Sequence, residues 1–409
     1  MPIQVFPTPS AGASYSSQPP ASASSVLLDG QLVTAGSIST TVTGTGAPWL
    51  LYANGAGTTT ITIAGTPYTV TAGSTVGTAA FTGSQSVTVA TTAPAPTPFT
   101  TSTLPSASSW SGVAYGQISG TNYYVAVATS GTAGAYSTNG TTWTASTMPS
   151  ADSWYAVTFG NGYFVATAYG TSNGAYSTNG TTWTSSSMPS SSSWLGVTYG
   201  NISGTNYYVA VGSGTKGAYS TNGSTWTAST MPSTSNWYGV TYGNGYFVAI
   251  QRSATTAGAY SINGTTWTAA TMPSAAYWHA VGYGLVGATP TYVAVAQQST
   301  TAGAYSTNGT SWTASTMPSA SDWFGVTYGN GYFVAVTYNS TAGAYSTDGS
   351  TWTAATLPSA ALWNGVTYGN GYFVAVANGT STNPVQGAYY AFTPLPVAYG
   401  IYNGATVRA

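Results

Sequence analysis

Very few side chains in this sequence could take part in acid–base or metal chemistry. The 409 residues include 3 Lys and Arg, 4 Asp and Glu, 1 His and no Cys. The acids are Asp29, Asp152, Asp322 and Asp348, and the histidine is His279. A zinc site needs three or four clustered ligands, and most glycosidases need a pair of carboxylates. We therefore expect no metal, no cofactor and no catalytic residue, so the sequence predicts a protein that is not an enzyme.

Individual ionisable positions support the same prediction. Asp348 stands where the other five copies of its hairpin motif have Asn, so we interpret it as a turn residue. A Ser-His-Asp triad around His279 would lack the G-x-S-x-G elbow, and we interpret His279 as a lone surface histidine. Asp152 and Asp322 fall in connections that we expect to lie too far apart to flank one glycosidic bond.

The charge balance excludes several classes of partner. The bases are Lys216, Arg252 and Arg408, and a net charge of −1 cannot neutralise a row of phosphates, so we expect no nucleic-acid binding. No apolar run approaches the roughly 18 residues of a membrane span, so we expect no membrane insertion. The start, MPIQVFPTPSAG, lacks the basic and apolar regions of a signal peptide. With 43% hydrophobic and 14% aromatic residues, the chain can nevertheless bury a core.

The elements that position these residues come from an internal repeat. One series of tryptophans recurs every 40 to 45 residues: Trp110, Trp154, Trp194, Trp237, Trp278, Trp323 and Trp363. A second series follows Asn-Gly or Asp-Gly turns: Trp143, Trp183, Trp226, Trp267, Trp312 and Trp352. Each of the first six units contains four runs of aromatic and β-branched residues separated by GNG and TNG hairpin turns or their variants. That period with four strands is typical of a β-propeller blade, and the second series predicts core between blades.

The ends of the repeat array predict how the propeller closes. The seventh unit, from Trp363, has only three strands. Residues 99–110, FTTSTLPSASSW, align without gaps on residues 143–154, WTASTMPSADSW. An N-terminal strand would therefore complete the last blade and leave no open sheet edge. The predicted fold is all-β, with a seven-bladed propeller over residues 98–393 closed by this strand.

Four further segments surround the predicted propeller. Residues 1–25 lack periodicity and are expected to form an extended N-terminal anchoring arm. Residues 26–92 alternate apolar and polar residues between turn signals, which predicts a small β-sandwich-like domain. The sequence APAPTP makes residues 93–97 a stiff linker, and residues 394–409 form a C-terminal tail.

The repeated motifs resemble two kinds of known propeller. S-T-N-G-T-T-W resembles a shortened Asp-box, the hairpin of sialidase-type propellers, although sialidase chemistry would need a Glu and an arginine cluster that this chain lacks. The YGNGYFVAV segments, which begin at residues 242, 328 and 368 with small departures, are similar to repeats in propellers of bacteriophage tail and other virion proteins. The resemblance covers residues 98–393 and implies a tail-fibre, receptor-binding or surface-decoration component.

The unusual residues of the ring map to one face. With the GVTYG strand innermost, the connections from second to third and from fourth to first strands open on that face, and loops on a rigid scaffold are where binding residues concentrate. Chance is the alternative, because loops tolerate variation. The expected ligand-binding face comprises Asp152, Tyr169, Lys216, Asn236, Arg252, Tyr277, His279, Gln297, Gln298 and Asp322, with Tyr338 beside them.

The sequence thus predicts a non-enzymatic phage virion structural protein that displays a propeller for recognition of a host-surface glycan. Its expected partners are other virion proteins, through the arm and small domain, a host glycan or protein, and further copies of itself. Its expected location is the virion surface. A capsid decoration protein is the close alternative and would wedge an ordered arm between capsid subunits. A secreted glycan-binding lectin is the other alternative and would carry a signal peptide.

Overall fold

The structure is a computed structural model that describes residues 98–379 and 387–391, the strands between residues 25 and 92 with Gly65, and one strand near the C-terminus. These residues lie in strands, bridges, turns, bends or loops, and no helix among them could cross a membrane. The chain divides into two compact units, residues 1–95 with 392–409 and residues 96–391. The arm predicted over residues 1–25, except Ser25, and the linker predicted over 93–97 lie outside the described residues.

The first unit contains two sheets whose strands pair mostly in antiparallel fashion. One sheet has the strand order β2-β1-β31-β4-β7, and the other has the order β3-β8-β5-β6. The segment predicted to be a C-terminal tail contributes β31, which pairs with β4 and β1. The strands are β1 (Ser25–Leu28), β2 (Gln31–Thr34), β3 (Ile38–Thr45), β4 (Trp49–Asn54), β5 (Thr58–Ile63), β6 (Thr66–Thr71), β7 (Thr75–Gly77), β8 (Thr82–Thr92) and β31 (Val397–Asn403).

The second unit repeats one antiparallel, four-segment pattern. Its strands are β9 (Thr100–Ser102), β10 (Trp110–Ile118), β11 (Thr121–Ala128), β12 (Ala133–Ser137), β13 (Thr144–Thr147), β14 (Ser153–Gly160), β15 (Tyr163–Tyr169), β16 (Thr171–Ser177), β17 (Thr184–Ser192), β18 (Trp194–Ile202), β19 (Thr205–Ser220), β20 (Thr227–Gly243), β21 (Tyr246–Ser261), β22 (Thr268–Val286), β23 (Thr289–Gln297), β24 (Thr300–Ser306), β25 (Thr313–Ser321), β26 (Trp323–Gly329), β27 (Tyr332–Ser346), β28 (Thr353–Gly369), β29 (Tyr372–Asn378) and β30 (Gly387–Ala391).

The turn residues form the hairpins that the sequence predicts. In the GNG tip between β14 and β15, Asn161 and Gly162 have φ of 45° and 81°. Positive φ at both central residues is the pattern of the hairpin turn whose twist matches the flanking strands. In the hairpin before Trp352, the Asp348 carboxylate accepts hydrogen bonds from the amides of Ser350 and Thr351, both at 2.7 Å. The turn role predicted for Asp348 is confirmed.

Several strands run on from one repeat into the next, where separate short strands were expected. β20, for example, holds the outermost segment of one repeat and the innermost segment of the following one. The reason is extra pairing beyond the blade, because Ser213 and Gly214 of β19 pair with Asn236 and Ser235 of β20. The loops of the predicted binding face therefore form short ladders, and we call these ladders the rim.

The first tryptophan series forms the core of each repeat. All seven side chains are fully buried. In every case the indole N–H donates a hydrogen bond of 3.0 to 3.3 Å to the carbonyl of the serine four residues earlier. A buried indole needs such a partner, so the spacing from the PS dipeptide to each tryptophan has a structural cause.

Neighbouring repeats pack through aromatic rings against glycine. A Cβ at Gly116 would overlap the ring of Phe159 in the next repeat, and a Cβ at Gly369 would overlap the ring of Tyr115 in the first. Trp143 of the second series packs with Val374 and Val376 in one buried cluster, as predicted for core between blades.

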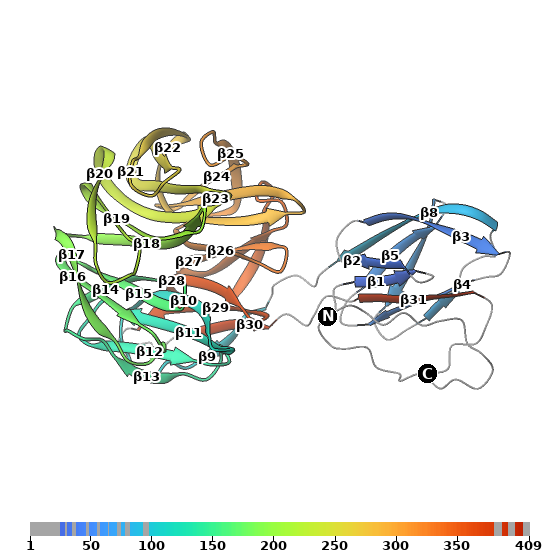
Figure 1. Ribbon diagram of the computed structural model, residues 1–409, viewed down its shortest axis with the longest axis horizontal. Helices are drawn as coiled ribbons and strands as arrows, with labels where there is room; N and C mark the ends of the chain where they lie inside the picture. Colours follow the sequence, from blue (N-terminus) through green and yellow to red (C-terminus); the bar gives the residue numbers. More distant parts are fainter. Residues whose placement is uncertain are drawn as a thin grey trace. The chain divides into compact units, whose positions relative to one another are not determined.

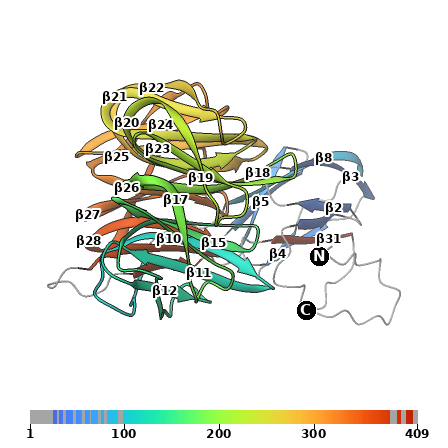
Figure 2. The same cartoon turned by 60° about the vertical axis from the view of Figure 1, so that its left-hand side comes forward.

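The last strands of the second unit lie against its first ones. β30 pairs with β9, with Ala388 opposite Thr101, and β28 and β29 contact β10 (Figure 1). β28 and β10 are also neighbours in the second view (Figure 2). In addition, the hydroxyl of Tyr124 donates a hydrogen bond to the carbonyl of Gly369, so the first repeat contacts the seventh. The innermost strand of every repeat also contributes residues to one shared cavity.

Candidate functional site

Seven β-bulges lie at the same place in the seven innermost strands. In β10 the pairing register shifts between Trp110 and Gly112, so Ser111 has no partner in the ladder. The same shift follows each tryptophan of the first series. A bulge leaves one residue unpaired and redirects its side chain. The residue after each tryptophan is therefore turned out of its sheet.

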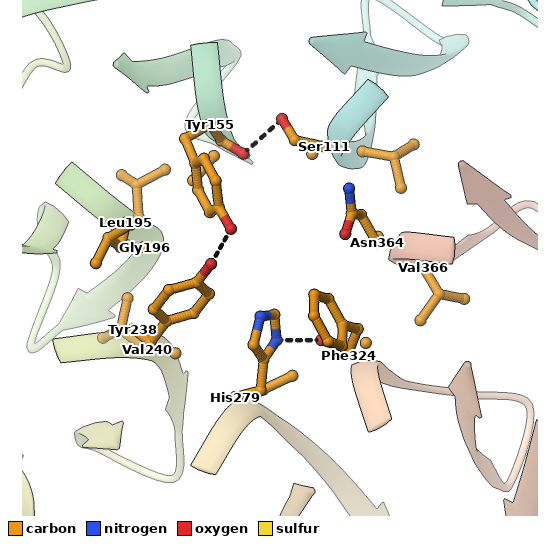
Figure 3. Close-up of a pocket in the computed structure, with 18 of the residues that line it drawn as sticks. Ser111, Tyr155, Leu195, Gly196, Tyr238, Val240, His279, Phe324, Asn364 and Val366 are labelled. Atoms are coloured by element: carbon orange, nitrogen blue, oxygen red, sulfur yellow. Dashed lines mark hydrogen bonds between the residues drawn. The ribbon is translucent and has the colours of Figure 1, made fainter. Parts of the chain in front are cut away.

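These bulge residues form a ring around a cavity of about 190 Å³. Figure 3 shows them in chain order around the opening. A ring of seven valines, from Val113 to Val366, also lines the cavity. The bulge residues are Ser111, Tyr155, Leu195, Tyr238, His279, Phe324 and Asn364. We call this space the axial pocket.

The bulge position varies in a strand that otherwise repeats. The tryptophan before it and the valine two residues after it are the same in all seven units, whereas the bulge position holds six residue types. A purely structural position in near-identical repeats would be filled alike, because it meets the same neighbours seven times. This variation can be seen in the sequence, but His279 was the only bulge residue among the predicted site residues.

His279 is the one histidine of the chain, and the interpretation of it as a surface residue is wrong. Its side chain is 7% exposed, because the bulge after Trp278 turns it toward the axis instead of solvent. Nδ1 lies 2.7 Å from the carbonyl oxygen of Phe324, which only accepts hydrogen bonds, so Nδ1 carries the proton. Burial lowers the pKa of His279 to about 3, a shift that the Phe324 carbonyl opposes and the Arg252 charge reinforces.

The second ring nitrogen of His279 is consequently a free acceptor. The imidazole is neutral at neutral pH and Nδ1 holds its single proton, so Nε2 carries a lone pair. Nε2 is buried and has no hydrogen-bond partner among the described residues. An unpaired buried acceptor costs roughly 1–3 kcal/mol. The described residues include fourteen unpartnered buried side-chain atoms, and His279 Nε2 is the one among them whose residue lines the axial pocket.

The other polar bulge residues form hydrogen bonds with neighbouring repeats or with each other. Ser111 Oγ lies 2.8 Å from the carbonyl oxygen of Trp154 in the next repeat, and Asn364 Nδ2 donates to the carbonyl of Trp110 at 3.2 Å. The hydroxyls of Tyr155 and Tyr238 share a hydrogen bond along one side of the pocket (Figure 3). Burial raises the pKa of both tyrosines, so both are neutral phenols at neutral pH.

A wider cavity of about 400 Å³ shares four residues with the axial pocket and is also lined by rim loops. Tyr169, Arg252 and Tyr338 line it from connections between second and third strand segments, and Asn378 from the end of β29. The Arg252 guanidinium lies 5.1 Å from the centre of the Tyr238 ring, a cation–π contact. We call this wider space the mouth.

The residues predicted from sequence divide into two groups. Tyr169 and Arg252 line the mouth, His279 lines the axial pocket, and Tyr338 also lines the mouth. The rest are found outside both linings. Asn236, Tyr277 and Gln297 pair in the ladders of the rim. Asp152 accepts a hydrogen bond from Asn173, and Asp322 accepts one from the amide of Ser299. Lys216 and Gln298 are exposed and line neither cavity.

Sequence reasoning missed the larger part of the pocket. Ser111, Tyr155, Leu195, Tyr238, Phe324 and Asn364 were not predicted. No group of three His, Asp or Glu side chains that could hold a metal ion occurs in the part of the chain that the structure describes. The functional groups that line the axial pocket and the mouth are therefore mainly phenols, amides, one neutral imidazole and one guanidinium.

No protein-family model matches the sequence, and no curated protein matches it either. Solved structures do match. The chain is similar to a streptogramin B lyase at 12% identity, with a TM-score of 0.61 over 72% of this chain and 97% of the lyase. It is similar to virginiamycin B lyase from Staphylococcus aureus at 11% identity, with a TM-score of 0.62 over 72% and 99% of the two chains. YCF48 from Cyanidioschyzon merolae matches at 14% identity, with a TM-score of 0.55 over 72% and 99%.

At these identities the likeness shows the fold alone, and that fold is a β-propeller. The prediction of an all-β propeller built from repeats is confirmed. The prediction that the protein is not an enzyme is wrong, because these propellers include lyases. The predicted phage structural function is wrong as well, since these structures point away from a virion component. The resemblance behind it rested on motifs that build hairpins and carry no activity. The predicted partners and location stay predictions.

Proposed function

We propose that residues 98–393 form a seven-bladed propeller, closed by β9, whose axial pocket binds one small organic molecule. Closure is supported by the pairing of β9 with β30 and by the packing of Tyr115 against Gly369. The size of the site fits the proposal. A 150 Å³ apolar cavity holds benzene, so a space of about 190 Å³ under a mouth of about 400 Å³ accommodates one or two rings.

The observation that carries this proposal is the unpartnered Nε2 of His279. The atom is buried in the lining of the pocket, it carries a lone pair, and its ring is held in place by the Phe324 carbonyl. A ligand with an N–H or O–H group would satisfy it, and the gain would be large because the acceptor is already desolvated. A preformed cavity with a few placed polar groups is typical of small-molecule sites.

A lyase acting in the same pocket is a second candidate. A neutral imidazole with an oriented lone pair can take a proton from a carbon acid. The electron pair of the broken C–H bond would form a C=C bond, and the leaving oxygen would take a proton from the Tyr155–Tyr238 pair. Because the pKa of His279 is about 3, negative charge developing in the ligand would have to stabilise the imidazolium. Among the structural neighbours, a virginiamycin B lyase in which a histidine is replaced by alanine is described as catalytically inactive.

Ligand-observed NMR with the full chain and a library of small ring compounds tests the binding proposal. We expect hits that bind the wild type and are lost in His279→Phe, which replaces the acceptor by the residue found at the next bulge, Phe324. Leu195→Met is the matched control, since it alters an apolar member of the same ring. Hits that bind His279→Phe as well as the wild type would refute the proposal.

Incubation of the hits with the protein then separates the two candidates. Mass spectrometry would detect an elimination as two products whose masses sum to that of the substrate. Products formed by the wild type and not by His279→Phe would establish the lyase. Binding without products for every hit would favour the binding function.

A further inference from the structure

One wall of the pocket and its mouth is continuously aromatic. The rings follow one another in the order Tyr338, Phe324, His279, Tyr238, Tyr155 and Tyr169. Centres of neighbouring rings lie 4.0 to 6.2 Å apart. Tyr338 and Phe324 are stacked with their planes at 19°, and Tyr155 meets Tyr238 edge to face at 88°. A planar aromatic ligand would extend this wall by the offset and edge contacts that aromatic rings prefer.

The opposite wall carries hydroxyl and amide groups. Ser111 and Asn364 lie there in the axial pocket, and Thr129 and Asn378 lie there in the mouth. Some of these side chains hydrogen-bond each other; for example, Asn364 Nδ2 donates to Asn378 Oδ1 at 2.8 Å. This wall therefore adds polarity to the pocket but no charge.

Arg252 is the only charged side chain among the described residues that line the pocket and mouth. No aspartate lines either cavity. The guanidinium has five N–H donors. It packs over the face of the Tyr238 ring and hydrogen-bonds the Tyr238 side chain, so Tyr238 occupies only part of these donors. A planar fork matches a carboxylate geometrically, and one cation balances one negative charge.

Arg252 and His279 flank the same ring. The guanidinium carbon lies 5.1 Å from the centre of Tyr238, and the imidazole centre lies 4.3 Å from it. One small ligand can therefore reach both, with an anionic group toward Arg252 and a donor group toward Nε2. The aromatic wall between them would hold the body of that ligand.

We propose that the ligand of this pocket is a small aromatic carboxylate that also bears a hydroxyl or N–H donor. The inference rests on the proposed binding function and adds the class of ligand. The competing interpretation is that Arg252 is structural and only packs on Tyr238. The two differ in whether removing the charge changes ligand preference or only stability.

The test uses the full-length chain and three probes: 4-hydroxybenzoate, 4-hydroxybenzamide and benzoate. The amide has nearly the shape of the acid without its charge, and benzoate lacks the hydroxyl donor. Dissociation constants are measured by NMR titration for the wild type, His279→Phe, Arg252→Gln, Arg252→Lys and Lys216→Gln. Lys216→Gln is the matched control, because it removes an exposed cation that lines neither cavity. Thermal unfolding verifies that each variant is folded.

We expect the wild type to bind 4-hydroxybenzoate about tenfold or more tightly than 4-hydroxybenzamide, as for a hydrogen bond to a charged group. Arg252→Gln should abolish that preference, Arg252→Lys should keep part of it, and Lys216→Gln should keep all of it. The acid should bind less tightly as salt rises, because the ion pair is partly exposed. Benzoate should bind more weakly than 4-hydroxybenzoate to every protein that retains His279.

Two outcomes would overturn the inference. Equal binding of acid and amide, unchanged in Arg252→Gln, would mean that Arg252 is structural. The proposed function would still stand if the amide kept its dependence on His279. Failure of all three probes to bind the wild type at millimolar concentration would exclude this ligand class, whereas the pocket itself is judged by the wider library and His279→Phe.

Discussion

Acidification should destabilise the second unit through a single residue. His279 is neutral and buried, and its pKa of about 3 compares with 6.5 for a free histidine. His279 therefore binds a proton more weakly in the folded state than in the unfolded chain. The stability that follows is fully present above pH 6.5 and is lost progressively as the pH falls toward 3.

The size of this effect follows from the two pKa values. Each unit of pH between them removes about 1.4 kcal/mol, so that about 2 kcal/mol is lost between pH 7 and pH 5. For a unit of the size of residues 96–391, this loss lowers the unfolding midpoint by about 3 °C. The chain has no Glu and only one His, and a free aspartate side chain has a pKa of about 3.9, well below pH 5. Above pH 5, His279 is thus the dominant side chain in the pH dependence.

Tryptophan fluorescence during thermal unfolding measures this directly. Of the 14 tryptophans only Trp49 lies outside residues 96–391, so the signal reports the second unit. Melting curves at pH 7, 6 and 5 with constant ionic strength should show the midpoint falling in the wild type. His279→Phe should remove most of that fall. A wild type with no pH dependence, or a variant with an undiminished one, would refute the assignment of a buried neutral His279.

Three further substitutions test the packing between repeats and the turn chemistry. Gly369→Ala should lower the free energy of unfolding by about 3 kcal/mol or more, because its Cβ would overlap the Tyr115 ring. Denaturant unfolding measures this loss, and Gly343→Ala is the control, because the nearest atom there is 3.3 Å from the new Cβ. Equal losses in the two variants would contradict the prediction. Tyr124→Phe should cost about 1–2 kcal/mol in the same assay, since the buried carbonyl of Gly369 loses a donor, and an unchanged stability would show that this bond contributes nothing. Asp348→Asn should change stability by less than about 0.5 kcal/mol at pH 7, since five other hairpins use Asn there, and a large loss would point to a role for the charge.

Much of the fold could be predicted from the sequence, because it is encoded locally. Hairpin turns need residues that tolerate positive φ, and each GNG or TNG triplet supplies them within three positions. In the first series, each tryptophan keeps its spacing from the serine four residues earlier because its indole N–H donates to that serine's carbonyl. Such requirements involve residues close together in the chain, so they can be recognised from the sequence alone.

The candidate site was less predictable, although its variation lies in the printed sequence. His279 follows Trp278 in a strand, and alternation alone would not place its side chain on the axis. The β-bulge does so, and a bulge arises from the register between two strands, which no single strand specifies. Arg252 and Tyr338 were predicted on one face, because loop order around a propeller follows from topology, but their joint lining of one mouth was not predicted.

The sequence by itself determined the repeat, the strands, the turns and the propeller class, since each depends on spacing and residue type over a few positions. Only the tertiary structure decided that seven bulge residues meet around one pocket, that His279 is buried with a free lone pair, and that Arg252 and an aromatic wall stand above it. The physical reason is that burial and pKa depend on the sum of contacts from every repeat around the axis, and those contacts join residues far apart in the chain.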